Sequence, residues 1–129
     1  MNTKSKGSSA ERELIHMFWK NDWAAFRAAG SGSTRYPCPD IIAGNSLRKL
    51  ALEIKYIDNC RKYFPKKEID ELREFSHIFG CEAWVGVKFQ GKGWHFFSVE
   101  DLKETPAGFG IGLKDSELRG FSFSNLLSL

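Results

Sequence analysis

The stretch "PDIIAGNSLRKLALEIK", residues 39–55, constrains the fold of this chain most strongly. Two apolar runs flank a tight polar turn at Gly44-Asn45, which predicts paired strands over residues 40–43 and 47–56. Charged side chains are rarely buried without a partner. Asp40 in the first run, with Glu53 and Lys55 near the end of the second, therefore calls for an explanation.

The rest of the pattern predicts one α/β domain built on a central sheet. The chain has 129 residues, of which 42% are hydrophobic, and this suits a single core that spans residues 1–129. A first helix is predicted over residues 8–21, because Ser8 and Glu11 match a capping box. A second is predicted over residues 65–79, with Pro65 at its start and Gly80 as its stop.

Strand signals and linkers complete this outline. Residues 1–7 are predicted to be a flexible basic tail, and "DNCRKYFPKK" a polar link. The region from Asp101 onward has no clear pattern, except that "SNLLSL" could form a helical turn. Further strands are predicted over residues 23–28, 82–89 and 93–99. Because strands and helices alternate, the sheet is expected to have helices packed on it.

The basic residues are concentrated in the first half of the chain. Residues 1–67 hold 13 Lys and Arg against 6 Asp and Glu, whereas residues 68–129 hold 6 against 10. The basic half favours a polyanionic partner such as a nucleic acid, with Arg35, Lys66 and Lys67 among the candidate contacts. A solvated basic surface explains the charge equally well.

The cysteines and the hydropathy of the chain favour an intracellular protein. The three cysteines, Cys38, Cys60 and Cys81, are odd in number and lack metal-like pairing, which favours a reduced, cytoplasmic protein. The first nine residues lack the apolar core of a signal peptide, and no apolar run reaches the roughly 20 residues that span a membrane. Neither a membrane partner nor a nucleotide cofactor is expected.

Strand geometry answers the question that the hairpin raises. Alternate side chains of a strand share a face, so Glu53 and Lys55 point away from the face of Leu52 and Ile54. If the two strands pair, Asp40 lies near the same edge as Glu53. Two carboxylates, helped by the backbone carbonyl of Ile54, can hold a hard divalent cation such as Mg²⁺. Lys55 could then orient a water on the metal or neutralise charge that develops on phosphorus.

This arrangement resembles the PD-(D/E)xK nuclease signature, with Pro39-Asp40 and Glu53-Ile54-Lys55 as its parts. The segments "GSSAERELI", "FRAAGSGS", "PDIIAGN", "LALEIK", "LREFSHIFG" and "VGVKFQGKGWHFF" are, in order, similar to the archaeal Holliday-junction resolvases. The resemblance covers about residues 7–98. It implies a restriction-endonuclease-like fold with a mixed sheet, and a homodimeric, Mg²⁺-dependent endonuclease that cuts four-way DNA junctions. Mn²⁺ would be expected to substitute.

The same resemblance implies roles for individual residues. Glu11 in "AERE" would contribute to the metal site with Asp40, Glu53 and Ile54, and Lys55 would be catalytic. Ser31 would be the catalytic serine of the loop, although Ser33 is close to it. Phe75 and Phe79 would lie near the dimer or junction surface. The DNA contacts implied by the resemblance are Arg12, Arg27 and Lys88.

Simpler interpretations stay open for several of these residues. Glu11 could only complete the capping box, Asp40 could cap a turn, and Glu53 and Lys55 could form a surface pair. Phe75 and Phe79 could be plain core, and Ser31 could be a turn residue. Arg12 and Lys88 could be solvated surface residues. Apolar residues of the C-terminal half are candidates for a dimer face or for the core, namely Trp94, Phe96, Phe97 and Phe109.

Two other functions also stay open. A related nuclease of the same superfamily could act on linear or damaged duplex. A non-catalytic DNA-binding module could use the basic half alone, but such a module has no use for Asp40, Glu53 and Lys55 together.

Overall fold

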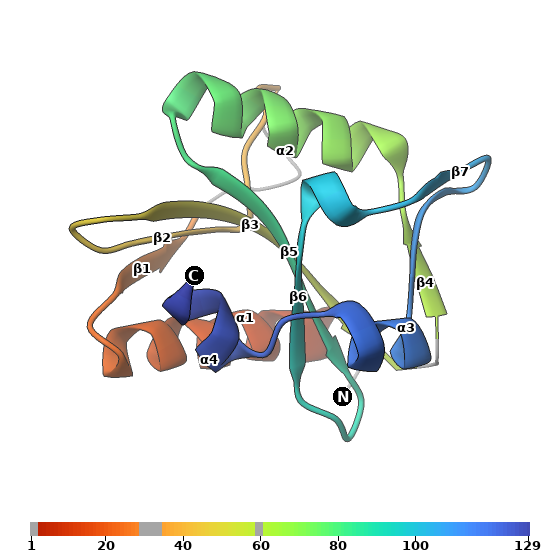
Figure 1. Cartoon of the computed structure of the whole chain (residues 1–129), viewed down its shortest axis with the longest axis horizontal. Coiled ribbons are helices and arrows are strands. Elements are labelled where there is room, and N and C mark those ends of the chain that lie inside the picture. The colour runs from red at the N-terminus through yellow and green to blue at the C-terminus, as the bar shows by residue number, and fades with distance from the viewer. Residues whose placement is uncertain (1–2, 29–34, 59–60) are drawn as a thin grey trace.

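The computed structural model describes residues 3–28, 35–58 and 61–129 (Figure 1). The helices are α1 (Thr3–Lys20), α2 (Lys66–Phe79), α3 (Leu113–Arg119) and α4 (Phe123–Ser128), with a 3-10 helix η1 at Val99–Asp101. The strands are β1 (Ala24–Arg27), β2 (Ile41–Gly44), β3 (Lys49–Ile57), β4 (Arg61–Phe64), β5 (Glu82–Phe89), β6 (Trp94–Ser98), β7 (Glu104–Thr105) and β8 (Gly108–Gly112).

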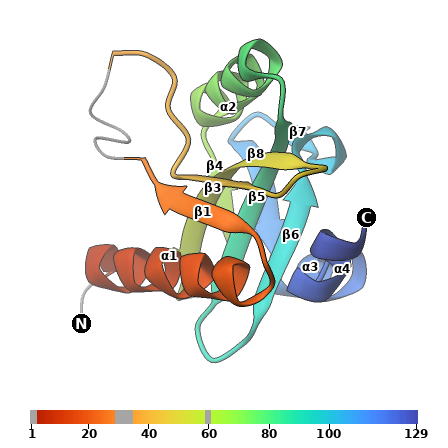
Figure 2. The ribbon, with the colours of Figure 1, turned by 90° about the vertical axis from the view of Figure 1, so that its left-hand side faces the viewer.

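Within these residues, five strands form a central sheet in the order β1-β2-β3-β5-β6. Strands β3 and β5 are parallel, whereas the other neighbouring pairs are antiparallel, so the sheet is mixed as predicted. The helix α2 provides the crossover between β3 and β5. In Figure 2, α1 lies on one side of this sheet and α2 on the other.

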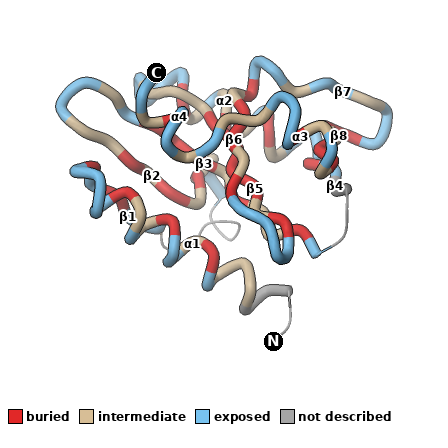
Figure 3. The backbone as a smooth tube through the Cα atoms, turned by 60° about the horizontal axis from the view of Figure 1, so that its bottom comes forward, coloured by how far each residue is buried: buried red, intermediate tan, exposed pale blue. Residues whose placement is uncertain are grey.

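Two apolar cores lie on the two faces of the central sheet. On the α1 face, Leu14 and Phe18 pack with Leu50, Leu52 and Ile54 of β3. On the α2 face, Ile69 and Leu72 pack with Val85 and Val87 of β5 and with Ala51 of β3. Figure 3 shows buried backbone running through the strands, with exposed positions mostly on helices and turns. The predicted alternation along β3 is therefore confirmed.

The hairpin between β2 and β3 forms as expected, with its turn slightly displaced. Gly44 is the last residue of β2 and pairs with Lys49, so the turn spans residues 45–48. The side-chain Oδ1 of Asn45 accepts hydrogen bonds from the backbone N–H groups of Leu47 and Arg48, at 2.8 and 2.7 Å. Asparagine thus stabilises the turn through its own side chain.

The first helix begins earlier than predicted. It starts at Thr3, so Ser8 and Glu11 lie inside α1 and do not form a capping box. Residues 3–7, predicted as part of a flexible basic tail, belong to α1 in this structure, while residues 1–2 lie outside the described part. The Lys6 ammonium lies 5.6 Å from the ring centroid of Tyr56 on β3, a contact that favours the added turn. The second helix agrees with prediction, with Gly80 in a left-handed conformation at its end.

A second, smaller sheet was not predicted from the sequence. The predicted polar link contains β4, which pairs with β8, and β8 pairs with β7. Phe64 of β4 is fully buried in the core on the α2 face. A segment of four residues is too short to be predicted as a strand from its own sequence when its partner strand lies far along the chain. The helical turn expected in "SNLLSL" is confirmed as part of α4.

Candidate active site

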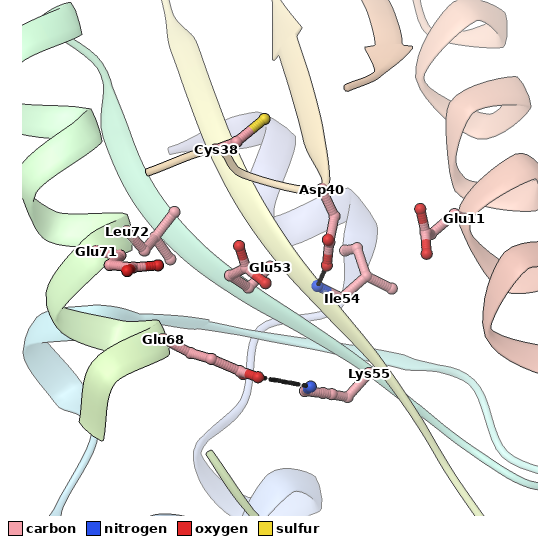
Figure 4. A pocket seen from close by; sticks show the side chains of 9 residues that line it. All are labelled: Glu11, Cys38, Asp40, Glu53, Ile54, Lys55, Glu68, Glu71 and Leu72. Carbon is pink, nitrogen blue, oxygen red and sulfur yellow. Dashed lines mark hydrogen bonds and ion pairs between the residues drawn. The ribbon is translucent and has the colours of Figure 1, made fainter. Parts of the chain in front are cut away.

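Asp40 and Glu53 come together at the end of the β2–β3 hairpin. Asp40 directly precedes β2, and its backbone N–H donates to the carbonyl of Leu52 at 3.0 Å. Its carboxylate Oδ2 accepts the backbone N–H of Ile54 at 2.9 Å, as the dashed line in Figure 4 marks. Glu53, the neighbour of Ile54, projects from the α2 face of β3. The hairpin therefore fixes one carboxylate beside the other.

The two carboxyl groups cannot easily both be ionised. Burial, followed by the charge of Asp40 and a hydrogen bond with Asp40, raises the pKa of Glu53 to about 9. At neutral pH Glu53 therefore holds a proton in the metal-free protein. A bound cation would offset this shift by favouring the ionised carboxylates, so the chemistry of the pair fits a divalent metal. Among the described residues, no three His, Cys, Asp or Glu side chains form a ready-made metal cluster.

Glu11 approaches the pair from α1. Its carboxylate faces Asp40 in Figure 4, and Arg27 of β1 donates from Nε to its Oε1 at 3.1 Å. Burial, followed by the charge of Asp40, raises the pKa of Glu11, while Arg27 acts in the opposite direction. Glu11 is thus brought to the site, but it is held by Arg27, and its direct ligation of a metal stays a prediction.

Lys55 lies on the same face of β3 as Glu53 and reaches toward α2. Its ammonium donates to Glu68 Oε1 at 3.3 Å and lies 3.2 Å from Glu68 Oε2. Glu68 was not among the predicted site residues. The i, i+3 spacing of Glu68 and Glu71 could have indicated an acidic edge on α2, but the position of that edge over β3 is a tertiary property.

These side chains line one cavity of about 310 Å³ between β3, α1 and α2. Glu71 and Leu72 of α2 and Cys38, none of them predicted site residues, line it as well. Burial, and then the charges of Glu53 and Asp40, raise the pKa of the Cys38 thiol. Cys38 is therefore a neutral thiol at the rim of an acidic cavity. The cavity combines paired carboxylates with a lysine, which suits metal-assisted hydrolysis of a phosphodiester.

The predicted DNA contacts have different environments. Arg12 is exposed on α1, next to Glu11. Lys88 of β5 donates to Glu13 Oε2 at 2.6 Å, and Trp94 Nε1 donates to Glu13 Oε1 at 3.0 Å. Lys88 is thus already paired in this structure.

The remaining predicted contacts lie before β2 and at the start of α2. The guanidinium of Arg35 lies 5.3 Å from the ring centroid of Tyr36. Lys66 pairs with Asp70 at 2.9 Å, and Lys67 with Glu71 at 3.9 Å. Ser31 and Ser33 lie outside the described residues.

Comparison with known proteins gives consistent matches. A family model described as archaeal Holliday junction resolvase (Hjc) matches residues 2–127. A crossover junction endodeoxyribonuclease Hjc of Archaeoglobus fulgidus is 41% identical over 127 residues, which cover 93% of this chain and 93% of that protein. The protein of the same name from Sulfolobus acidocaldarius is 32% identical over 129 residues, which cover 98% and 90%.

A solved structure supports the same relationship. It is that of Archaeoglobus fulgidus Hjc, described as a Holliday junction resolvase from an archaeal hyperthermophile. It superposes with a TM-score of 0.87 at 38% identity and covers 93% of this chain and 97% of that one. The predicted fold class is therefore confirmed. Among the described residues, no helix combines the length and apolar character needed to cross a membrane.

Proposed function

This chain belongs to the archaeal Holliday junction resolvase family, and we propose that it cuts four-way DNA junctions at the cavity between β3 and α2. The observation that carries this assignment of the site is the buried carboxyl pair of Asp40 and Glu53 beside Lys55. The relatives are named crossover junction endodeoxyribonucleases, which makes hydrolysis of a DNA phosphodiester the reaction of this enzyme.

Nucleases of this kind generally depend on a metal ion, and we propose Mg²⁺, with Mn²⁺ as a substitute. Asp40 and Glu53 would hold it, with the carbonyl of Ile54 as a third oxygen donor and Glu11 as a further contributor. Oxygen donors suit these hard cations, which usually keep several waters. When bound, the cation supplies a Lewis acid and a more acidic water.

The protein's own side chains have distinct roles in this proposal. Asp40 is held by the Ile54 N–H and so presents a fixed acceptor. Glu53 would release its proton to solvent and so become an anionic oxygen donor for the cation. Lys55 places a positive charge where the negative charge on the reacting phosphate increases. Ser31 is retained as a proposed catalytic residue.

Binding of the junction would come mainly from contacts to phosphates. We propose that Arg12 and Arg27 contact the backbone near the cavity, and that Lys88 does so after leaving Glu13. Arg35, Lys66 and Lys67 would extend the basic surface. Arg27 would have a second role, because it holds Glu11 in place.

Resolution of a junction requires two nicks in opposing strands, and we propose that a C₂ dimer supplies the two cavities. The proposed dimer face is the α2 apolar patch, formed by Tyr36, Pro37, Phe75, Ile78 and Phe79. Within it Ile78 is 77% exposed and Phe79 57%, and the rings of Phe75 and Phe79 stack at 5.2 Å. Of the two interpretations left open for four aromatic residues, a dimer face or the core, the core is confirmed, because all four side chains are buried, namely Trp94, Phe96, Phe97 and Phe109.

The site is tested with Asp40→Asn, Glu53→Gln and Lys55→Ala. Each should lose cutting of a four-way junction in Mg²⁺ by at least about 100-fold, because the carboxylates hold the cation and Lys55 stabilises the transition state. Binding measured in EDTA should stay within about threefold, since affinity comes mainly from Lys and Arg. Glu100→Gln, a change at an exposed carboxylate on η1, is the matched control. Substantial cleavage by the three site variants would refute the assignment.

A further inference from the structure

We propose that Glu68 is a positioning residue that holds the ammonium of Lys55 on the α2 side of the cavity. This inference rests on the proposed function, in which Lys55 is catalytic and Asp40 and Glu53 hold the cation. It assigns to the first turn of α2 a role in the reaction that neither the motif nor the resemblance includes. Three features of the structure support it.

The first feature is the contact itself. The Lys55 ammonium is nearly equidistant from the two oxygens of Glu68, at 3.3 Å from Oε1 and 3.2 Å from Oε2. Glu68 Oε2 is shielded from solvent and has no hydrogen-bond donor among the described residues, so its contact with Lys55 is purely ionic. The ring centroid of Phe64 lies 5.7 Å from the same nitrogen. Two groups from the β4–α2 segment therefore define where the ammonium lies.

The second feature is the surplus of carboxylates in the cavity. Glu11, Asp40, Glu53, Glu68 and Glu71 all line it, whereas Lys55 is its one cation among the described residues that line it. A lysine side chain is long and flexible, so its ammonium goes to the carboxylate that is best placed. Without Glu68, the ammonium would turn to Glu53, with whose charge it already interacts. The ammonium would then occupy the place of the cation, and it would lie away from the reacting phosphate.

The third feature is how the fold fixes Glu68. Its backbone N–H donates to the carbonyl of Pro65 at 3.1 Å in the first turn of α2. Pro65 follows β4 directly, and Phe64 of β4 pairs with Phe109 of β8. The small sheet thus anchors the start of α2 independently of the β2–β3 hairpin. Rigid support of this kind is what keeps a catalytic group within the narrow range of productive geometry.

The test compares Glu68→Gln, which keeps the shape and removes the charge, with Glu68→Asp, which keeps the charge on a shorter side chain. Single-turnover cleavage of a four-way junction is measured with enzyme in saturating excess, and junction affinity is measured separately in EDTA. We expect Glu68→Gln to cut at least about 10-fold more slowly with unchanged affinity, and Glu68→Asp to recover part of the rate. Asp70→Asn, in the same helix but outside the cavity, is the matched control and should keep the wild-type rate.

A second comparison separates positioning from a general effect on folding or charge. In a Lys55→Ala background, Glu68→Gln should cause no further loss of cleavage rate, because there is no ammonium left to position. This slow cleavage is measured over long times at high enzyme concentration. The proposal is overturned if Glu68→Gln cuts at the wild-type rate or faster, or if its loss is the same in both backgrounds. If Lys55→Ala itself cuts normally, the proposed function fails first, and the two failures are thus distinguishable.

Discussion

Asp40 and Ile54 are joined by a hydrogen bond of 2.9 Å from the backbone N–H of Ile54 to the Asp40 carboxylate. This bond ties a side chain at the start of β2 to the backbone of β3, next to Glu53. The carboxylate of Asp40 is therefore placed by the rigid sheet, and the pairing with Glu53 does not depend on a flexible side chain. Burial, followed by the charge of the Asp40 carboxylate held in this place, raises the pKa of Glu53.

The pKa of Glu53 predicts how stability depends on pH when no metal is bound. The ordinary value is 4.5 and the native value is about 9, so between these values the unfolded chain has lost a proton that the native state keeps. The contribution of Glu53 to stability must therefore fall as the pH rises from about 5 to 8. Glu53→Gln removes the group that titrates. In EDTA, the unfolding free energy of this variant relative to that of wild type should therefore rise by at least about 1 kcal/mol between pH 5 and pH 8. Urea unfolding at both pH values measures the change, and an unchanged difference would contradict the burial of this pair.

The basic residues should differ in their effect on the salt dependence of junction binding. Removal of one phosphate contact lowers the slope of log K against log salt by about 1. Arg12→Ala should produce this change, because Arg12 is exposed beside the cavity. Lys88→Ala should weaken binding less, since Lys88 must first leave Glu13. Lys114→Ala, an exposed lysine outside the basic half, serves as the control. If Arg12 and Lys88 variants keep the wild-type slope, the DNA lies on another face.

Arg48 should be a large contributor to stability although it lies away from the cavity. Its Nε and Nη2 donate to the two oxygens of Glu82 at 2.8 Å each, and Nη1 donates to the carbonyl of Leu126 at 2.7 Å. Arg48→Ala should cost about 1–2 kcal/mol of unfolding free energy, because it removes a bidentate pair to a carboxylate that is 39% exposed and leaves it only the donor of Trp84 Nε1. Arg48→Lys should retain only part of the stability contributed by Arg48, since lysine lacks the planar guanidinium that donates to both carboxylate oxygens.

The pH dependence of the Arg48 variant follows from its partner. The hydrogen bond from Arg48 lowers the pKa of Glu82 below 4.5, so the stabilisation is present above that value. The difference between wild type and Arg48→Ala should narrow as the pH falls below about 4. Thermal or urea unfolding of both proteins at pH 7 and pH 3.5 would measure this difference in stability. The same difference at both pH values would argue against this ion pair.

Dimer formation should depend on the α2 apolar patch. Phe79→Glu replaces an exposed aromatic ring with a carboxylate. In a dimer formed through the α2 apolar patch, this charge would be buried without a partner. Sedimentation equilibrium should show a monomer, and circular dichroism should show native helix content because Phe79 is 57% exposed in the single chain. Leu118→Glu changes an exposed leucine of α3 and should remain dimeric. A Phe79→Glu variant that sediments as a dimer would exclude this face.

The central part of the site could be predicted because its geometry is local. Alternation along one strand places Glu53 and Lys55 together, and one tight turn brings Asp40 to them. Glu68 could not be found in this way, because its place over Lys55 depends on β4, a strand that exists only through its pairing with β8. The partner of Arg27 was missed for the same reason, since Glu11 and Arg27 meet only when α1 packs against β1.

The choice between a dimer face and the core for the C-terminal aromatic residues was open for a different reason. The apolar residues Trp94, Phe96 and Phe97 exceed what a sheet covered on one face would need, so a dimer face stayed open beside the core. The central sheet is covered on both faces, with Trp94 and Phe96 in the α1-side core and Phe97 in the α2-side core. Composition alone does not tell how many faces of a sheet are covered.

Cleavage of a four-way junction and of linear duplex with the same arm sequence tests the proposed function most directly. The strands are labelled individually, and the purified protein is incubated with each substrate in Mg²⁺. We expect two nicks in opposing strands of the junction at positions related by its two-fold symmetry, cutting of the duplex at least about 100-fold more slowly, and loss of both nicks in Asp40→Asn. Equal cutting of the duplex, or a single unpaired nick in the junction, would contradict it.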